Sequence, residues 1–308
     1  MRVLDGSWTD WEPLSQESSV TIGVLDGVHL GHRALLSHLD DRLMRVVLTF
    51  DPHPLEVLRP GTHPRLITTI PERIDLLGAA GVDCVGVLDL AEIKEQTPEQ
   101  FISEILVGKI DVGHVVVGAD FRFGKDRAGD VELLKTAGKE HGYSVEPIEL
   151  VENLGAPISS SRIRGLIESG HVDEAAELLG SRFTLTNIVV DGDKRGREIG
   201  FPTANLRPPQ RKLIPATGVY ACFARVREQV HPAAVNVGVR PTFGGEELLI
   251  EAFILEFSEE IYGEEMTVEF VEYLRPELRF DDVDALVDQM GEDVARSRDI
   301  LAGTGSGM

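Results

Sequence analysis

The chain has 308 residues, 42% of them apolar, which is enough for two domains that each bury a core. Its 52 acidic and 30 basic residues give a net charge of −22, which excludes nucleic acids and anionic membranes as partners unless basic residues cluster locally. We attribute this acidity to solubility or to a salty cytoplasm and not to a function.

Cysteine content and hydrophobicity limit the class of protein further. Cys84 and Cys222 stand in separate apolar stretches, which predicts reduced core thiols and not a disulfide or a metal cluster. No charged start leads into an apolar leader, and no apolar run approaches the length of a membrane span. The sequence therefore predicts a soluble, unprocessed, cytoplasmic protein that acts on small molecules, and it leaves the oligomeric state unassigned.

The first half alternates strand-like apolar runs with helical patterns, which predicts a doubly wound α/β domain. The expected strands are 20–25, 45–50, 84–88, 114–118 and 144–148, and the expected helices are 33–39, 71–80, 98–106, 131–141 and about 158–169. In such sheets ligands bind at the carboxyl ends of the strands. We expect three segments that follow strands, 23–32, 49–54 and 118–130, to converge on one crevice.

The chain is organised around residues 21–33, which predict a strand, a glycine turn and the start of a helix. The first turn of a helix carries unpaired N–H groups and partial positive charge, so His29 and His32 there complete a site for the phosphates of a nucleoside triphosphate. The glycine spacing matches neither the dinucleotide fingerprint nor the P-loop, which favours nucleotidyl transfer. An ordinary polar loop between a strand and a helix is the alternative.

Three other segments of the first half carry weaker signals. Residues 49–54 form either a proline-stiffened turn or a part of the site. In 118–130 two aromatic rings could stack on a planar ligand, and Arg122, Lys125 and Arg127 could neutralise phosphate. Serines 159–161 would ordinarily only cap a helix, but Arg162 one turn later could grip a phosphoryl group.

The second half changes to closely spaced strand patterns, which predicts a small antiparallel barrel closed by a terminal helix. The expected strands are 183–190, 218–226, 234–239, 248–257 and 266–274, followed by a helix over about 282–301. Residues 192–206 combine glycines and basic residues suited to covering phosphates with Thr203 and Asn205, whose oxygens suit Mg²⁺. A glycine-rich hairpin is the alternative there. Glu269 would ordinarily belong to the solvated face of its strand.

Taken together and in this order, the motifs resemble one family: the prokaryotic bifunctional riboflavin kinases/FMN adenylyltransferases, also called FAD synthetases. The resemblance extends from about residue 20 to about residue 301. It implies a Rossmann-like nucleotidyltransferase domain over 1–182 and a six-stranded antiparallel riboflavin-kinase barrel with a terminal helix over 183–308. Both activities would use ATP as co-substrate together with Mg²⁺.

In the first domain the resemblance rests on two motifs. Gly23-Val-Leu-Asp-Gly-Val-His-Leu-Gly-His32 is similar to G-x-F-D-G-x-H-x-G-H, with Leu25 in place of phenylalanine, and Ile158-Ser-Ser-Ser-Arg-Ile-Arg164 is similar to I-S-S-T-R-I-R. The resemblance implies that His29, His32 and Arg162 act on the phosphates. The implied nucleotide-binding residues are Gly23, Asp26, Gly31, Asp120, Ser159, Ser160, Ser161 and Arg164, and the implied flavin-binding residues are Phe50, Pro52, His53, Phe121 and Phe123.

In the second domain Gly196-Arg-Glu-Ile-Gly-Phe-Pro-Thr-Ala-Asn205 is similar to the kinase signature of the family. This resemblance implies Thr203 and Asn205 as metal ligands and Glu269 as the catalytic base. Asp191 stands where the family commonly carries a histidine. The implied nucleotide loop contains Gly192, Lys194, Gly196 and Gly200.

The implied chemistry is phosphorylation of riboflavin to FMN, followed by adenylyl transfer from a second ATP, which gives FAD and pyrophosphate. Two other classes of protein need weighing. A different nucleotidyltransferase would share H-x-G-H but has no reason to carry the P-T-A-N stretch of the second domain. A non-catalytic flavin-binding protein would be expected to lack His32, Arg162 or Glu269, and all three are present.

Overall fold

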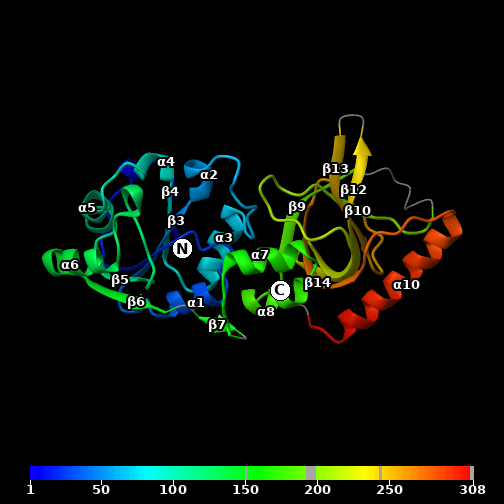
Figure 1. Ribbon diagram of the computed structural model, residues 1–308. Helices are drawn as coiled ribbons and strands as arrows, with labels where there is room; N and C mark the ends of the chain where they lie inside the picture. The colour runs from blue at the N-terminus through cyan, green and yellow to red at the C-terminus, as the bar shows by residue number, and fades with distance from the viewer. Residues whose placement is uncertain (150, 154, 192–198, 243–244, 306–308) are drawn as a thin grey trace. The chain divides into compact units, whose positions relative to one another are not determined.

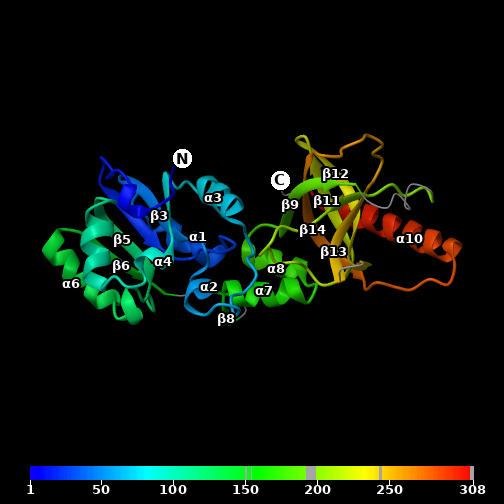
Figure 2. The ribbon, with the colours of Figure 1, turned by 90° about the horizontal axis from the view of Figure 1, so that it is seen from above.

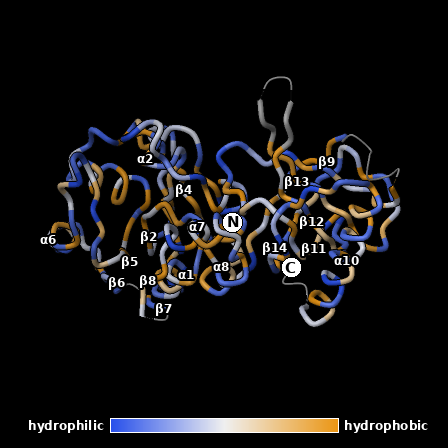
Figure 3. The backbone as a smooth tube through the Cα atoms, turned by 45° about the vertical axis from the view of Figure 1, so that its right-hand side comes forward, coloured by the Kyte–Doolittle hydropathy of each residue, from blue (hydrophilic) through white to orange (hydrophobic). Residues whose placement is uncertain are grey.

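The computed structural model describes residues 1–149, 151–153, 155–191, 199–242 and 245–305 (Figure 1). Its contacts divide the chain into two compact units, Met1–Ser160 and Ser161–Met308. Each unit has its own sheet, and hydrophobic stretches occur within both (Figure 3). The domain boundary expected after residue 182 stays a prediction.

The first unit is built on a six-stranded parallel sheet in the order β1-β4-β3-β2-β5-β6. This confirms the predicted α/β class and adds β1, whose three residues are too few to show a pattern. The strands are β1 (Arg2–Leu4), β2 (Ser18–Ile22), β3 (Met44–Phe50), β4 (Cys84–Leu88), β5 (Val112–Gly118) and β6 (Ser144–Ile148).

Helices cover both faces of this sheet. Leu36 and Leu77 pack in one apolar cluster with Val47 of β3, whereas Leu134 packs in the other cluster with Val46 from the opposite face of the same strand. The helical segments are η1 (Trp8–Asp10), α1 (Leu30–Ser37), α2 (Pro54–Leu58), α3 (Ile70–Ala79), α4 (Leu90–Ile93), α5 (Pro98–Gln100), η2 (Phe101–Val107), η3 (Lys125–Arg127) and α6 (Val131–His141), and a small antiparallel pair joins β7 (Glu152–Asn153) to β8 (Ala156–Pro157).

The second unit is a closed barrel in the order β10-β13-β12-β11-β14-β9, which confirms the predicted six-stranded barrel with a terminal helix. Its elements are α7 (Ser160–Glu168), α8 (Val172–Leu179), β9 (Thr184–Val190), β10 (Ala204–Leu206), β11 (Gly218–Val226), β12 (Gln229–Thr242), β13 (Gly245–Ile254), β14 (Glu265–Arg275) and α10 (Val283–Ala302).

Helix α10 packs against the outside of the barrel (Figure 2). It begins after Asp282, whose carboxylate accepts a hydrogen bond from the Ala285 N–H at 2.8 Å. Asp293, Ser297 and Leu301 are its buried residues, and their spacing of four places them on one helix face. The helix therefore covers the side of the barrel formed by β11, β12 and β14.

Two predictions about the whole chain can be checked in the structure. Cys84 and Cys222 are both buried free thiols, as predicted. Across the described ranges, no helix has the length and apolar character needed to cross a bilayer.

Candidate functional site

The loop between β2 and α1 has an unusual backbone. Leu25, Gly27 and Val28 have positive φ angles of 52°, 86° and 41°. Glycine adopts this region freely, but a β-branched residue such as Val28 rarely does. The loop delivers the chain to His29, the N-cap residue of α1, whose Nδ1 accepts a hydrogen bond from the His32 N–H at 3.3 Å. The predicted placement of both histidines at a helix start is confirmed.

The two histidines form a stacked pair, with ring centroids 3.6 Å apart and an interplanar angle of 18°. Gly31 leaves room beside them, because a Cβ there would lie 3.1 Å from Cε1 of His29 and would crowd the ring. Nδ1 of His32 is buried and has no hydrogen-bond partner in the described part of the chain. Burial chiefly, and then the charges of His29 and Arg73, hold the pKa of His32 well below its usual range. His32 is therefore neutral at pH 7.

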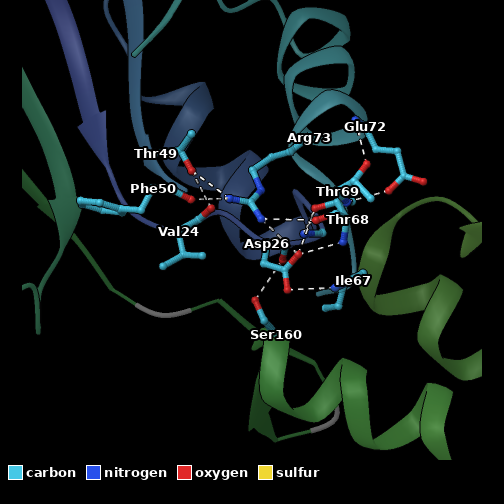
Figure 4. A network of polar contacts seen from close by, with 11 residues as sticks. Val24, Asp26, Thr49, Phe50, Ile67, Thr68, Thr69, Glu72, Arg73 and Ser160 are labelled. Atoms are coloured by element: carbon cyan, nitrogen blue, oxygen red, sulfur yellow. Dashed lines mark hydrogen bonds and ion pairs between the residues drawn. The ribbon is translucent and has the colours of Figure 1, made fainter. Parts of the chain in front are cut away.

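Asp26 connects this loop to the segment before α3 by hydrogen bonds (Figure 4). Its carboxylate is 1% exposed and accepts hydrogen bonds from the backbone N–H groups of Ile67 at 3.0 Å and Thr68 at 2.8 Å, and from the Thr68 hydroxyl at 3.0 Å. Because both carboxylate oxygens accept hydrogen bonds from the protein, Asp26 stabilises the conformation of the loop. The contact between Asp26 and the nucleotide stays a prediction.

The end of β3 lies beside the same loop. The Thr49 hydroxyl donates to the carbonyl oxygen of Val24 at 2.8 Å, which brings segments 23–32 and 49–54 together as predicted. Phe50 and Pro52 are partly exposed. His53 is 9% exposed and begins α2, with its Nδ1 accepting a hydrogen bond from the Leu55 N–H at 3.1 Å.

Segment 118–130 follows β5, the neighbour of β2 in the sheet. Phe123 belongs to the hydrophobic core and stacks on Phe121, which is partly exposed. Asp120 is exposed. Arg122 pairs with Asp130 at 2.9 Å and Lys125 pairs with Glu95 at 2.8 Å. The predicted neutralisation of phosphate by Arg122, Lys125 and Arg127 stays a prediction.

The serine motif joins the loop through one hydroxyl. Ser160 donates to the carbonyl oxygen of Asp26 at 3.0 Å (Figure 4), and Ser159 is partly exposed. Ser161, Arg162 and Arg164 fall in the second unit, so their contribution to the phosphate site stays a prediction.

The second unit contains a cavity of about 640 Å³ between the barrel and α10. Its polar lining includes Thr203, Asn205, Asn236 and Glu251 and, from later segments, Ser258, Glu259, Glu260, Arg275, Glu277 and Asp293. Tyr262, Leu278, Phe280, Leu286 and Met290 supply much of its apolar lining. A cavity with an apolar body and a few convergent polar groups is typical of a site for a small organic ligand.

Strand register explains why the polar groups meet. Asn205 of β10 lies opposite Glu251 of β13, and Glu251 lies opposite Asn236 of β12, so the three side chains share one face of the sheet. Oδ1 of Asn205 is buried and has no hydrogen-bond partner among the residues described, whereas its Nδ2 donates to the carbonyl oxygen of Thr203 at 3.3 Å. This donor set suits a hard cation such as Mg²⁺.

Two parts of the predicted kinase site lie elsewhere. Gly192, Lys194 and Gly196 are outside the described residues, and Gly200 is an exposed turn residue with a φ of 89°. Sequence reasoning missed Glu251. A glutamate between apolar neighbours in a strand pattern carries no motif, and only the pairing of β13 with the short strand β10 brings Glu251 to Asn205.

Glu269 does not line the cavity. It lies on β14, is 2% exposed and forms an ion pair with Arg182, whose guanidinium lies over the ring of Phe223 at 5.4 Å. The structure therefore gives no support to its predicted role as the base. The role of Glu269 as base stays a prediction. The solvated position that its strand pattern would ordinarily indicate is wrong, because the carboxylate is buried and paired with an arginine.

Both halves of the chain are similar to known protein families. A family model described as FAD synthetase matches residues 12–162, and one described as riboflavin kinase matches residues 179–301. Bifunctional riboflavin kinase/FMN adenylyltransferases from Listeria monocytogenes and Escherichia coli K12 are each 36% identical to this chain, covering 96% and 93% of it and 94% of each relative.

A solved structure from Streptococcus pneumoniae, described as a macrolide-efflux protein, is also similar. It has a TM-score of 0.88 and 33% sequence identity, and the match covers 97% of this chain and 99% of that one. The relatives from Listeria monocytogenes and Escherichia coli K12, which match over nine tenths of their length, carry the description bifunctional riboflavin kinase/FMN adenylyltransferase instead. The 36% identity to the curated relatives extends over more than nine tenths of this chain. It shows that this chain belongs to the family of bifunctional riboflavin kinase/FMN adenylyltransferases.

Proposed function

We propose that each unit carries one of the two activities of the family. The second unit would phosphorylate riboflavin with ATP, which gives FMN and ADP. The first would transfer the adenylyl group of a second ATP to FMN, which gives FAD and pyrophosphate. The observation that carries this division is the pair of separate sites, a histidine-capped helix start in one unit and an oxygen-lined cavity in the other. We infer a cytoplasmic location, where ATP and riboflavin are available.

In the kinase reaction the 5′-hydroxyl of riboflavin attacks the γ-phosphorus of ATP. We assign proton acceptance from this hydroxyl to Glu251, because it lines the cavity beside Asn205, whereas Glu269 is paired with Arg182 outside the cavity. Thr203 and Asn205 would hold Mg²⁺ through their side-chain oxygens. The bound ion would supply positive charge that offsets the charge on the phosphates. The apolar lining from α10 would receive the flavin ring.

In the adenylyl transfer an oxygen of the FMN phosphate attacks the α-phosphorus of ATP, and the bond to pyrophosphate breaks. The attacking phosphate is already an anion, so this step requires no protein base. Free N–H groups at the start of α1 and the imidazoles of His29 and His32 would stabilise the charge that develops on pyrophosphate. Arg162 would add a positive charge. Phe50 and Phe121, which keep partly exposed rings, would contact the flavin.

One experiment tests both halves of this assignment. Glu251→Gln removes the proton acceptor while keeping the shape of the side chain, so riboflavin phosphorylation should fall by roughly a hundredfold or more. Conversion of supplied FMN to FAD should remain at the wild-type rate. Chromatographic separation of riboflavin, FMN and FAD after incubation with MgATP measures both steps.

Glu269→Gln is the matched control. It should change kinase turnover far less than Glu251→Gln, provided that circular dichroism shows the variant to be folded. Near-normal turnover in Glu251→Gln together with a large loss in Glu269→Gln would return the role of base to Glu269.

A further inference from the structure

Arg73 is a buried arginine that no motif of the chain accounts for. It lies on α3, is 1% exposed, and extends its guanidinium toward the ends of β2 and β3 (Figure 4). Helix α3 does not need it as a cap, because Thr69 and Glu72 already form a capping box. An apolar side chain could fill such a position without the cost of burying a charge. The guanidinium therefore calls for another explanation.

The contacts of Arg73 join three segments of the first unit. One terminal nitrogen, Nη1, donates to the Thr49 hydroxyl at 3.1 Å and to the carbonyl oxygen of Phe50 at 3.4 Å. The other, Nη2, donates to the carbonyl oxygen of Thr68 at 3.4 Å and lies 3.6 Å from Oδ1 of Asp26. The planar guanidinium thus connects the end of β3, the segment that precedes α3 and the loop that precedes α1.

That loop needs support. Three of its residues have positive φ angles, two of them not glycine, and each non-glycine residue in this region costs about 1–3 kcal/mol that the surroundings must offset. Thr68 reinforces the contact, because its hydroxyl accepts a hydrogen bond from the Gly27 N–H at 3.0 Å while donating to Asp26. The network therefore fixes the loop that precedes α1.

We propose that Arg73 is a positioning residue for adenylyl transfer, which holds the strained loop and the end of β3 in the geometry that receives the phosphates of ATP. The proposal rests on the assignment of adenylyl transfer to the first unit. The positive charge of Arg73 also contributes, after burial and His29, to the lowered pKa of His32. Arg73 acts through Asp26, Thr49 and Thr68 and needs no contact with substrate.

The test is steady-state kinetics of the full chain with FMN and MgATP. Misplacement of phosphate-binding groups lowers turnover more than ground-state binding, so kcat of Arg73→Met should fall by about a hundredfold. Its KM for ATP should change by less than about threefold. Arg73→Lys keeps the charge but loses the planar fork, and it should lose roughly tenfold in kcat. Riboflavin phosphorylation should be unchanged in both variants.

Two further variants keep the proposal falsifiable. Thr68→Val removes the hydroxyl that joins Gly27 to Asp26 and leaves Arg73 in place. It should also lower the kcat of adenylyl transfer. This variant tests the network if Arg73→Met does not fold. Arg45→Met is the control, because Arg45 donates to the carbonyl oxygen of Leu36 at 2.7 Å at the other end of α1, and adenylyl transfer should be normal. Folded Arg73→Lys and Thr68→Val variants with kcat within twofold of wild type would overturn the proposal. Wild-type protein that makes no FAD from FMN would instead overturn the assignment of adenylyl transfer.

Discussion

At the scale of single residues, the lowered pKa of His32 predicts a pH dependence of stability. In the unfolded chain a histidine titrates near pH 6.5, whereas in the folded first unit burial of His32 and its cationic neighbours keep it neutral to lower pH. Below pH 6.5 the unfolded state therefore binds a proton that the folded state does not. The contribution of His32 to stability is complete above pH 6.5 and is lost as pH falls, by at most about 1.4 kcal/mol per pH unit.

The measurement uses the two tryptophans of the chain, Trp8 and Trp11, which both belong to the first unit and report on it alone. Urea unfolding followed by tryptophan fluorescence at pH 7.5, 6.5 and 5.5 should show a steeper loss for the wild type than for His32→Gln, which cannot titrate. The difference between the two curves removes the contribution of the other histidines. Parallel curves would show that His32 titrates normally in the folded state.

The same scale shows where residue roles could be read from the sequence. His29 and His32 were predictable because glycines and a helical pattern surround them, and these fix their place at the start of α1. The strand patterns alone did not distinguish Glu251 from Glu269, since each is an acidic residue between apolar neighbours in a strand. What separates them is the cavity face that Glu251 shares with Asn205 and the ion pair that Glu269 makes with Arg182. Both contacts join residues far apart in the sequence.

At the scale of elements, helix α10 is fixed to the barrel by a bidentate ion pair. Arg275 at the end of β14 donates through Nε to Oδ1 of Asp293 at 2.8 Å and through Nη2 to Oδ2 at 2.6 Å. Both residues line the cavity, together with Leu286 and Met290 of the same helix. The pair therefore couples the position of α10 to the shape of the cavity.

We expect Asp293→Asn to lower the free energy of unfolding of the second unit by about 2 kcal/mol, because a charge-assisted bidentate contact is lost in a largely buried place. The KM for riboflavin should rise as well, since α10 supplies the apolar lining. Thermal unfolding and kinase kinetics measure the two effects.

Arg298→Gln on the same helix is the control. The Arg298–Glu256 ion pair has an N···O distance of 3.3 Å and side chains that are 55% and 82% exposed, so its loss should cost little. Equal effects of the two substitutions would contradict the inference that the Arg275–Asp293 pair fixes α10 to the barrel.

Elements were predictable where their pattern was long enough. The strands of the parallel sheet and helix α6 lie close to their predicted positions, because each carries several apolar residues at the spacing of its element. Strand β10 was missed because its three residues lie inside a glycine-rich motif and obtain their pairing from β9 and β13. Helix α8 was not predicted, although its buried residues have helical spacing.

At the scale of the whole molecule, the change from alternating strands and helices to closely spaced strands predicted two separate cores, and the contacts divide the chain in that way. The sequence pattern alone placed the boundary after residue 182. The contacts place α7 and α8 with the barrel, because α8 packs against β14. These two positions of the boundary lead to different behaviour of isolated fragments.

We predict that residues 161–308, expressed alone, fold and phosphorylate riboflavin, whereas residues 183–308 are much less stable. The shorter fragment lacks the buried Val172, Ala175, Leu178 and Leu179 of α8, which together contribute roughly 5 kcal/mol or more, a large part of the stability of a single domain. It also lacks Arg182, which leaves the carboxylate of Glu269 buried without that partner.

Neither fragment contains tryptophan, so urea unfolding is followed by circular dichroism, and FMN formation is followed by chromatography. Equal stability and activity of the two fragments would show that α8 adds nothing to the barrel and that the boundary after residue 182 is sufficient.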